Sequence, residues 1–143
     1  MQRLFRFVTC LFFLNVSSAA FAVDENRVAF VVGNAAYEAV QPLANPGNDA
    51  LDISVALEAL GFDVVFGTDM SSADLRQAIV EFGRKAENAD VVLFYYAGHG
   101  FQAGGRNYML PVDAEFENAE ELLRETIDIG QVLAAMERSK GLK

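Results

Sequence analysis

Residues 91–100 have the sequence VVLFYYAGHG, an unbroken apolar run that ends in glycine, histidine and glycine. A run of this length predicts an apolar strand. His99 follows the strand directly, and catalytic or ligand-binding groups gather beyond the carboxyl ends of such strands in open α/β sheets. A single histidine is also commonly structural, so position alone leaves both readings of His99 open.

Two earlier apolar runs, 28–32 and 62–66, have the same character. Between the three runs lie two segments with apolar residues at helical spacing. The first begins near Asn48 and Asp49, one of which is expected to cap the helix, and ends at Gly61; the second follows Ser71. Strands that alternate with helices predict an α/β fold with a mostly parallel sheet and helices on both faces.

After His99 the pattern changes. Residues 101–110 predict a hairpin that turns at Gly104 and Gly105, residues 111–121 are acidic and irregular, and residues 127–136 return to helical spacing. A helix on a parallel sheet normally leads into another strand, and the sequence ends at that point. We therefore expect the domain to be incomplete, with at least one strand missing.

The first 22 residues have the order of a secretory signal. Arg3 and Arg6 precede the apolar run 7–16, and Ala20-Phe21-Ala22 supplies a small-residue cleavage motif. The run is too short for a membrane-spanning helix, which disfavours an uncleaved anchor. We predict a signal peptide at 1–22, a single domain at 23–143, a periplasmic or secreted protein and no membrane contact after cleavage.

Charge and cysteine content exclude several functions. The net charge is −9, and loss of Arg3 and Arg6 with the signal would make it −11, which disfavours nucleic acid and anionic lipid as partners. Cys10 is the only cysteine and would also be lost, so the mature chain would have no thiol nucleophile. One histidine without cysteine cannot form a zinc site, and we predict no metal site and no cofactor.

Other reaction classes fit the sequence poorly. No G-x-S-x-G elbow is present for a serine nucleophile, and the glycines from Gly98 to Gly105 lack both the spacing and the following helix of a phosphate-binding loop. Asp49 has two readings. It is either a helix cap or a carboxylate at the same rim as His99, where it could pair with a basic side chain.

Five segments together resemble the caspase-like peptidases, and within them the bacterial metacaspase-like group. The resemblance extends from about residue 27 to 143 and is specific because the motifs occur in the family's order and spacing. The segments are VAFVVGN at 28–34 with Tyr37, LANPGNDA at 43–50, LGF at 60–62, FYYAGHG at 94–100 and NYMLPVD at 107–113.

The resemblance implies a caspase-like three-layer sandwich and a Cys-His dyad peptidase that acts on polypeptides. His99 matches the catalytic histidine, and the Gly100 amide matches a donor of the oxyanion hole. Asp49 matches an aspartate that helps metacaspases select Arg or Lys before the scissile bond. Calcium dependence is common in that group, but no matching acidic cluster is identifiable here, and Ala97 stands where many metacaspases have serine.

The family's cysteine lies after the next strand, in a D-x-C-type motif, and no residue here matches it. We expect the chain to be inactive alone. It is read as a fragment of a longer cysteine endopeptidase, or as one half that pairs with a separate cysteine-bearing half. The alternative is a non-catalytic pseudopeptidase that acts as an exported protein-binding module.

Overall fold

A computed structural model describes residues 25–141 of the chain. The signal-peptide prediction for residues 1–22 lies outside the described residues. The three predicted apolar runs are strands, and they form one parallel sheet in the order β2-β1-β3. Their bounds are Arg27–Gly33 for β1, Phe62–Thr68 for β2 and Val91–Ala97 for β3.

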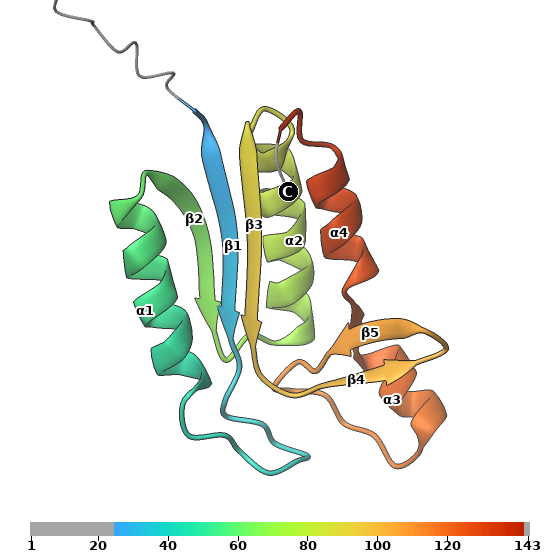
Figure 1. The fold of residues 1–143 in the computed structure, drawn as a ribbon. Coiled ribbons are helices and arrows are strands. Elements are labelled where there is room, and N and C mark those ends of the chain that lie inside the picture. The colour runs from blue at the N-terminus through green and yellow to red at the C-terminus, as the bar shows by residue number, and fades with distance from the viewer. Residues whose placement is uncertain (1–24, 142–143) are drawn as a thin grey trace, which may run out of the picture.

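Helices cover both faces of this sheet, which confirms the predicted α/β class (Figure 1). Helix α1 (Pro46–Ala59) lies on one face, and α2 (Ser72–Ala86) and α4 (Gly130–Glu137) lie on the other. Alternate residues of β1 supply the two cores, because successive side chains of a strand point to opposite faces. On the α2 side, the ring of Phe30 packs 5.6 Å from the rings of Phe82 and Phe94.

The helix boundaries correct one sequence prediction. Helix α1 begins at Pro46, with Asn45 at the N-cap position, so neither Asn48 nor Asp49 caps it. Proline is favoured at the first helical position because its missing N–H would have no partner there. The end of α1 is as predicted, since Gly61 follows it with a φ of 82°.

The rim beyond β3 holds a second, antiparallel sheet. Strands β4 (Gly100–Ala103) and β5 (Arg106–Met109) form the predicted hairpin, and its two turn glycines have φ values of 55° and 78°. Positive φ at both positions is what a two-residue turn of this type requires. Helix α3 (Ala119–Glu125) then forms, capped by Asn118, in a region whose first part was expected to be irregular.

The predicted helix at 127–136 is wrong in its first turn. Ile127 and Asp128 form β6, which pairs with Tyr108 and Met109 of β5, and α4 starts only at Gly130. The apolar spacing of this segment fits a helix, but pairing with β5 buries Ile127 completely. Tertiary contacts therefore override the local pattern.

Strand β3 lies at an edge of the parallel sheet, since among the described residues it pairs only with β1. After α4 the chain returns to the start of β3, where a side chain at Gly141 would collide with the backbone of Asp90. None of the helices in residues 25–141 is both long and apolar enough to span a membrane.

Candidate active site

His99 lies in the two-residue link between β3 and β4, at the carboxyl end of the parallel sheet. Its ring packs against Tyr37, with 4.7 Å between the ring centres, and its Nε2 lies 2.8 Å from the backbone carbonyl oxygen of Gln41. A carbonyl oxygen can only accept a hydrogen bond, so Nε2 carries the proton. The neutral ring then has its lone pair on Nδ1, where it can act as a base.

Two tyrosines hold the backbone of His99 in place. The N–H of His99 donates to the Tyr37 hydroxyl over 2.7 Å, and the Tyr96 hydroxyl donates to the carbonyl oxygen of His99 over the same distance. The two hydroxyls lie 3.2 Å apart. Because Tyr96 gives its single proton to the carbonyl, Tyr37 must donate to Tyr96. The hydrogen bonds thus form a closed ring that fixes both backbone groups of His99.

Burial raises the pKa of Tyr37 and of Tyr96 above the usual value of a phenol. Both hydroxyls therefore stay protonated at neutral pH and remain available as donors. This closed ring of hydrogen bonds also explains why residue 98 is a glycine. A Cβ at Gly98 would approach the hydroxyl oxygens of the two tyrosines to 2.5 and 2.6 Å. The glycine before His99 is thus required by the tyrosines that position it.

The N–H of Gly100 is not used by the hairpin. Leu110 N–H donates to the carbonyl oxygen of His99, which makes Gly100 and Met109 a non-hydrogen-bonded pair of the antiparallel ladder. The Gly100 amide therefore points away from β5. This N–H belongs to the residue directly after His99 and can donate to an anionic oxygen.

The loop that carries Gln41 is fixed at its base by two polar side chains. Asn34, fully buried at the end of β1, donates from Nδ2 to the carbonyl oxygens of Met70 and Leu110 and accepts from the Met70 N–H. Asp69 accepts hydrogen bonds from the N–H groups of residues 35 and 36 over 2.8 and 2.9 Å. These contacts join the ends of β1 and β2 to the rim.

Asp49 lies in the first turn of α1, exposed to solvent. It shares the carboxyl edge of the sheet with His99, but it does not line the cavity beside that residue. Its position favours the helix electrostatically, since a carboxylate in the first turn interacts well with the helix dipole. The structure thus places Asp49 at the predicted rim without bringing it into the immediate surroundings of His99.

The sequence analysis quoted Tyr37, Tyr96 and Asn34 only as parts of motifs, and it missed Gln41 and Asp69 in the site. Gln41 acts through its backbone carbonyl, which leaves no trace in the residue type. Within residues 25–141 no group of three or more His, Cys, Asp or Glu side chains is placed to hold a metal ion.

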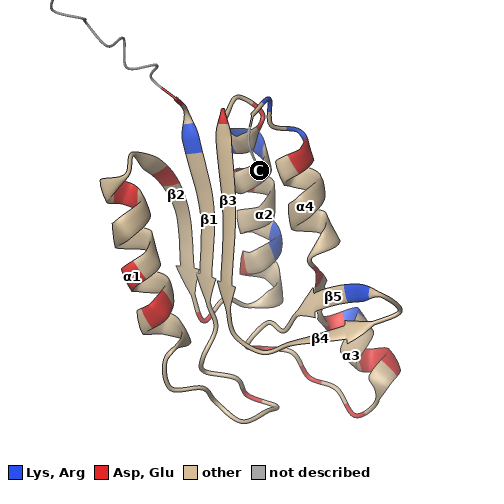
Figure 2. Ribbon diagram, viewed as in Figure 1, with Lys and Arg blue, Asp and Glu red and all other residues tan. Residues whose placement is uncertain are grey.

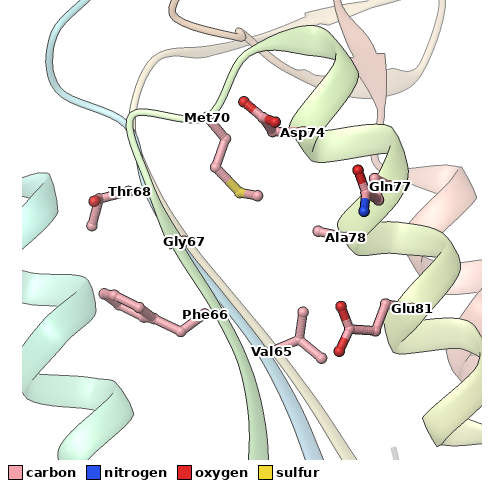
Figure 3. A pocket seen from close by; sticks show the side chains of 9 residues that line it. All are labelled: Val65, Phe66, Gly67, Thr68, Met70, Asp74, Gln77, Ala78 and Glu81. Carbon is pink, nitrogen blue, oxygen red and sulfur yellow. The ribbon is translucent and has the colours of Figure 1, made fainter.

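A cavity of about 310 Å³ between β2 and α2 is separate from the His99 region (Figure 3). Its acidic groups already have partners: Asp74 bonds to Ser71 in the cap of α2, and Glu81 lies 3.9 Å from Lys85. The cavity is lined by no histidine or cysteine, and its carboxylates are engaged by Ser71 and Lys85, so the candidate active site is the rim around His99.

This fold and site define a domain of the caspase class. Residues 26–140 match the caspase domain family, and the chain belongs to that family. The human mucosa-associated lymphoid tissue lymphoma translocation protein 1 is 34% identical over 90 residues, and its mouse homologue is 33% identical over 90. The aligned segment is 63% of this chain but only 11% of either relative.

Proposed function

We propose that this domain supplies the histidine and an oxyanion donor of a cysteine endopeptidase site. One observation carries the proposal: His99 is anchored through Nε2 on the Gln41 carbonyl, which leaves Nδ1 available as a base, and the hairpin does not use the amide of the next residue, Gly100. This is the arrangement that nucleophilic attack on a peptide carbonyl requires. Membership of the caspase family supports the same reaction class.

The reaction assigns one task to each group. Nδ1 of His99 takes the proton of a cysteine thiol, and the sulfur attacks the carbonyl carbon of the scissile bond. The Gly100 N–H donates to the oxygen on which negative charge develops. His99 then gives the proton to the leaving nitrogen as the C–N bond breaks, and water hydrolyses the thioester with His99 as base.

The thiol must come from polypeptide other than residues 25–141, which contain no cysteine. The outer side of β3 is unpaired among the described residues, and the chain at Gly141 returns to the start of that strand. A strand added there, parallel to β3, would end beside His99. We propose that a cysteine-bearing segment occupies this edge, either in continuation of the chain or as a separate subunit.

Asp49 is proposed to select Arg or Lys before the scissile bond. The charge distribution supports a basic substrate, because acidic side chains are frequent on α1, on α3 and in the loops at the carboxyl end of the sheet (Figure 2). Lys and Arg lie mainly on β1, α2 and the end of α4, although Arg106 on β5 and Arg124 on α3 are exceptions. An exported location is proposed with this function, since residues 1–22 have the pattern of a secretory signal.

The test is peptide cleavage by the domain expressed together with its cysteine-bearing segment. Blocked peptides with Arg, Lys, Asp or Ala before a fluorogenic leaving group report which residue is accepted. We expect cleavage after Arg and Lys, a loss of roughly 10²–10⁴-fold in kcat for His99→Ala, and no cleavage by the present chain alone. Undiminished cleavage by His99→Ala would reject the proposed dyad.

Asp49→Asn tests the selection of basic residues separately. The expected result is a lower kcat/KM for Arg and Lys peptides, with little change for neutral ones. Asp52→Asn is the matched control, because Asp52 is also exposed on α1 but lies further from the helix start. An equal effect of the two variants would assign the change to net charge and not to Asp49.

A further inference from the structure

A small apolar cavity adjoins the proposed catalytic groups. Its volume is about 230 Å³, and His99 and Gly100 form one wall. This volume is below the roughly 300–1,000 Å³ typical of cofactor and drug-sized sites, and it suits one side chain better than a whole ligand. The other walls include the side chains of Val40, Leu110, Phe116 and Leu122.

These walls belong to the third hydrophobic core of the domain. The buried residues of this core are Tyr37, Leu110 and Ala114. Val40 comes from the loop after β1, Phe116 from the segment after β5, and Leu122 from α3. All three are only half-buried, and they line a cavity together with His99, so part of this apolar surface is accessible there. Apolar surface exposed in a concave site gains free energy when an apolar group replaces the water there.

The cavity disfavours a charged or strongly polar occupant. His99 is the only side chain with a polar group among those that line it. A basic or acidic group would lose its hydration without gaining an ionic partner. The acidic residue proposed for basic substrates, Asp49, lies outside the lining, on α1. In Figure 1, α1 and α3 stand on opposite sides of the carboxyl end of β3.

The proposed reaction then fixes which substrate residue reaches the cavity. Gly100 holds the carbonyl oxygen of the scissile bond, and His99 protonates the leaving nitrogen. The leaving nitrogen belongs to the residue directly after the scissile bond, and the side chain of that residue is attached to the Cα bonded to this nitrogen. That side chain therefore lies against the imidazole. We propose that the cavity binds an aliphatic side chain, such as Leu or Met, directly after the scissile bond.

This inference rests on the proposed function, but it is testable by binding to the present chain. Four blocked pentapeptides share a central Arg: one has Leu after it, one Ala after it, one Lys after it, and one has Leu before it and Ala after it. His99 is the single histidine, so its imidazole NMR signals report binding without overlap. We expect the Arg-Leu peptide to bind roughly 10–100-fold more tightly than the other three.

Leu122→Ala should remove most of this preference, because it takes away one apolar wall of the cavity. Leu123→Ala is the matched control, because Leu123 is the next residue of α3, is 41% exposed and does not line the cavity. Thermal unfolding establishes that both variants fold. Equal affinity for the four peptides, no binding, or an unchanged preference in Leu122→Ala would overturn the assignment.

The outcomes also separate this inference from the proposed function. If the Leu preference depends on Leu122 but the assembled domain cleaves no peptide, the cavity stands as a peptide-binding site and the peptidase proposal fails. If cleavage depends on His99 but not on the residue after the scissile bond, the peptidase proposal stands and the cavity assignment fails.

Discussion

The parallel sheet and the rim around His99 are held together by different forces. In the sheet, β1 is buried on both faces, and Phe30 is packed by the rings of Phe82 and Phe94 with none of its surface exposed. In the rim, Tyr37, Tyr96 and Asn34 act through hydrogen bonds to named backbone atoms. Hydrophobic burial is large but non-directional, whereas hydrogen bonds are weaker and fix geometry. The sheet therefore accounts for stability, and the rim for the orientation of His99.

The largest expected effect is in the sheet. Phe30→Ala should lower the free energy of unfolding by about 3–5 kcal/mol, because it removes a fully buried ring and leaves a cavity. Urea unfolding measures the loss. Val80→Ala on α2 is the control, since Val80 is 71% exposed and its truncation should change stability by no more than about 0.5 kcal/mol. A similar small effect for Phe30→Ala would contradict the view that this core dominates stability.

Where the sheet meets the rim, we expect a substitution to cause a smaller loss of unfolding free energy but a larger change around His99. Asn34→Ala should cost about 1–3 kcal/mol, because it leaves the N–H of Met70 without its partner and removes one of the two hydrogen bonds to the carbonyl of Leu110. The loop that carries Gln41 should also loosen, which ¹⁵N shifts of the His99 imidazole would detect. Asn48→Ala, on the exposed side of α1, should change neither quantity. Unaltered imidazole shifts in Asn34→Ala would show that the loop is held by other contacts.

Within the rim, Tyr96→Phe should cost about 0.5–1.5 kcal/mol at neutral pH, the usual net worth of one hydrogen bond. It should also change the dependence of stability on pH. The pKa of Tyr96 is raised in the folded state by burial, so the unfolded chain loses this proton first, near pH 10. Stability is therefore fully present below about pH 10 and falls as the pH rises further.

Urea unfolding at pH 7, 10 and 11 tests this expectation. The fall in stability above pH 10 should be smaller in Tyr96→Phe than in the natural chain. It should be smaller again in the double variant that also carries Tyr37→Phe, because burial raises the pKa of Tyr37 as well. Identical pH profiles in all three proteins would refute the role assigned to burial of the two phenols.

The smallest effect is expected at the surface of the sheet layer. Lys85 on α2 contacts the carboxylate of Asp63 on β2 over 2.7 Å, with both groups partly exposed. Lys85→Ala should cost about 0.2–1 kcal/mol, and the cost should shrink in 1 M salt. Arg76→Ala, another exposed cation of α2, is the control. A cost that persists in high salt would point to packing of the lysine stem and not to the ion pair.

The sequence by itself determined the α/β class, the three strands of the parallel sheet, the glycine turn of the hairpin and the position of His99 after β3. Each of these depends on residues that are close in the sequence: apolar runs, helical spacing and glycines where a turn needs positive φ. The motifs around 28–50 and 94–113 also sufficed to indicate the caspase family.

Only the tertiary structure decided how His99 is held and what surrounds it. The bond from His99 to the Gln41 carbonyl joins residues 58 positions apart, and the bond to Tyr37 joins residues 62 apart. Likewise, Ile127 has helical spacing but becomes a strand because β5 is available to pair with it. Backbone acceptors and distant partners leave no periodic pattern in a sequence, so the hydrogen-bond partners of His99 and the apolar wall beside it appear only when the chain is folded.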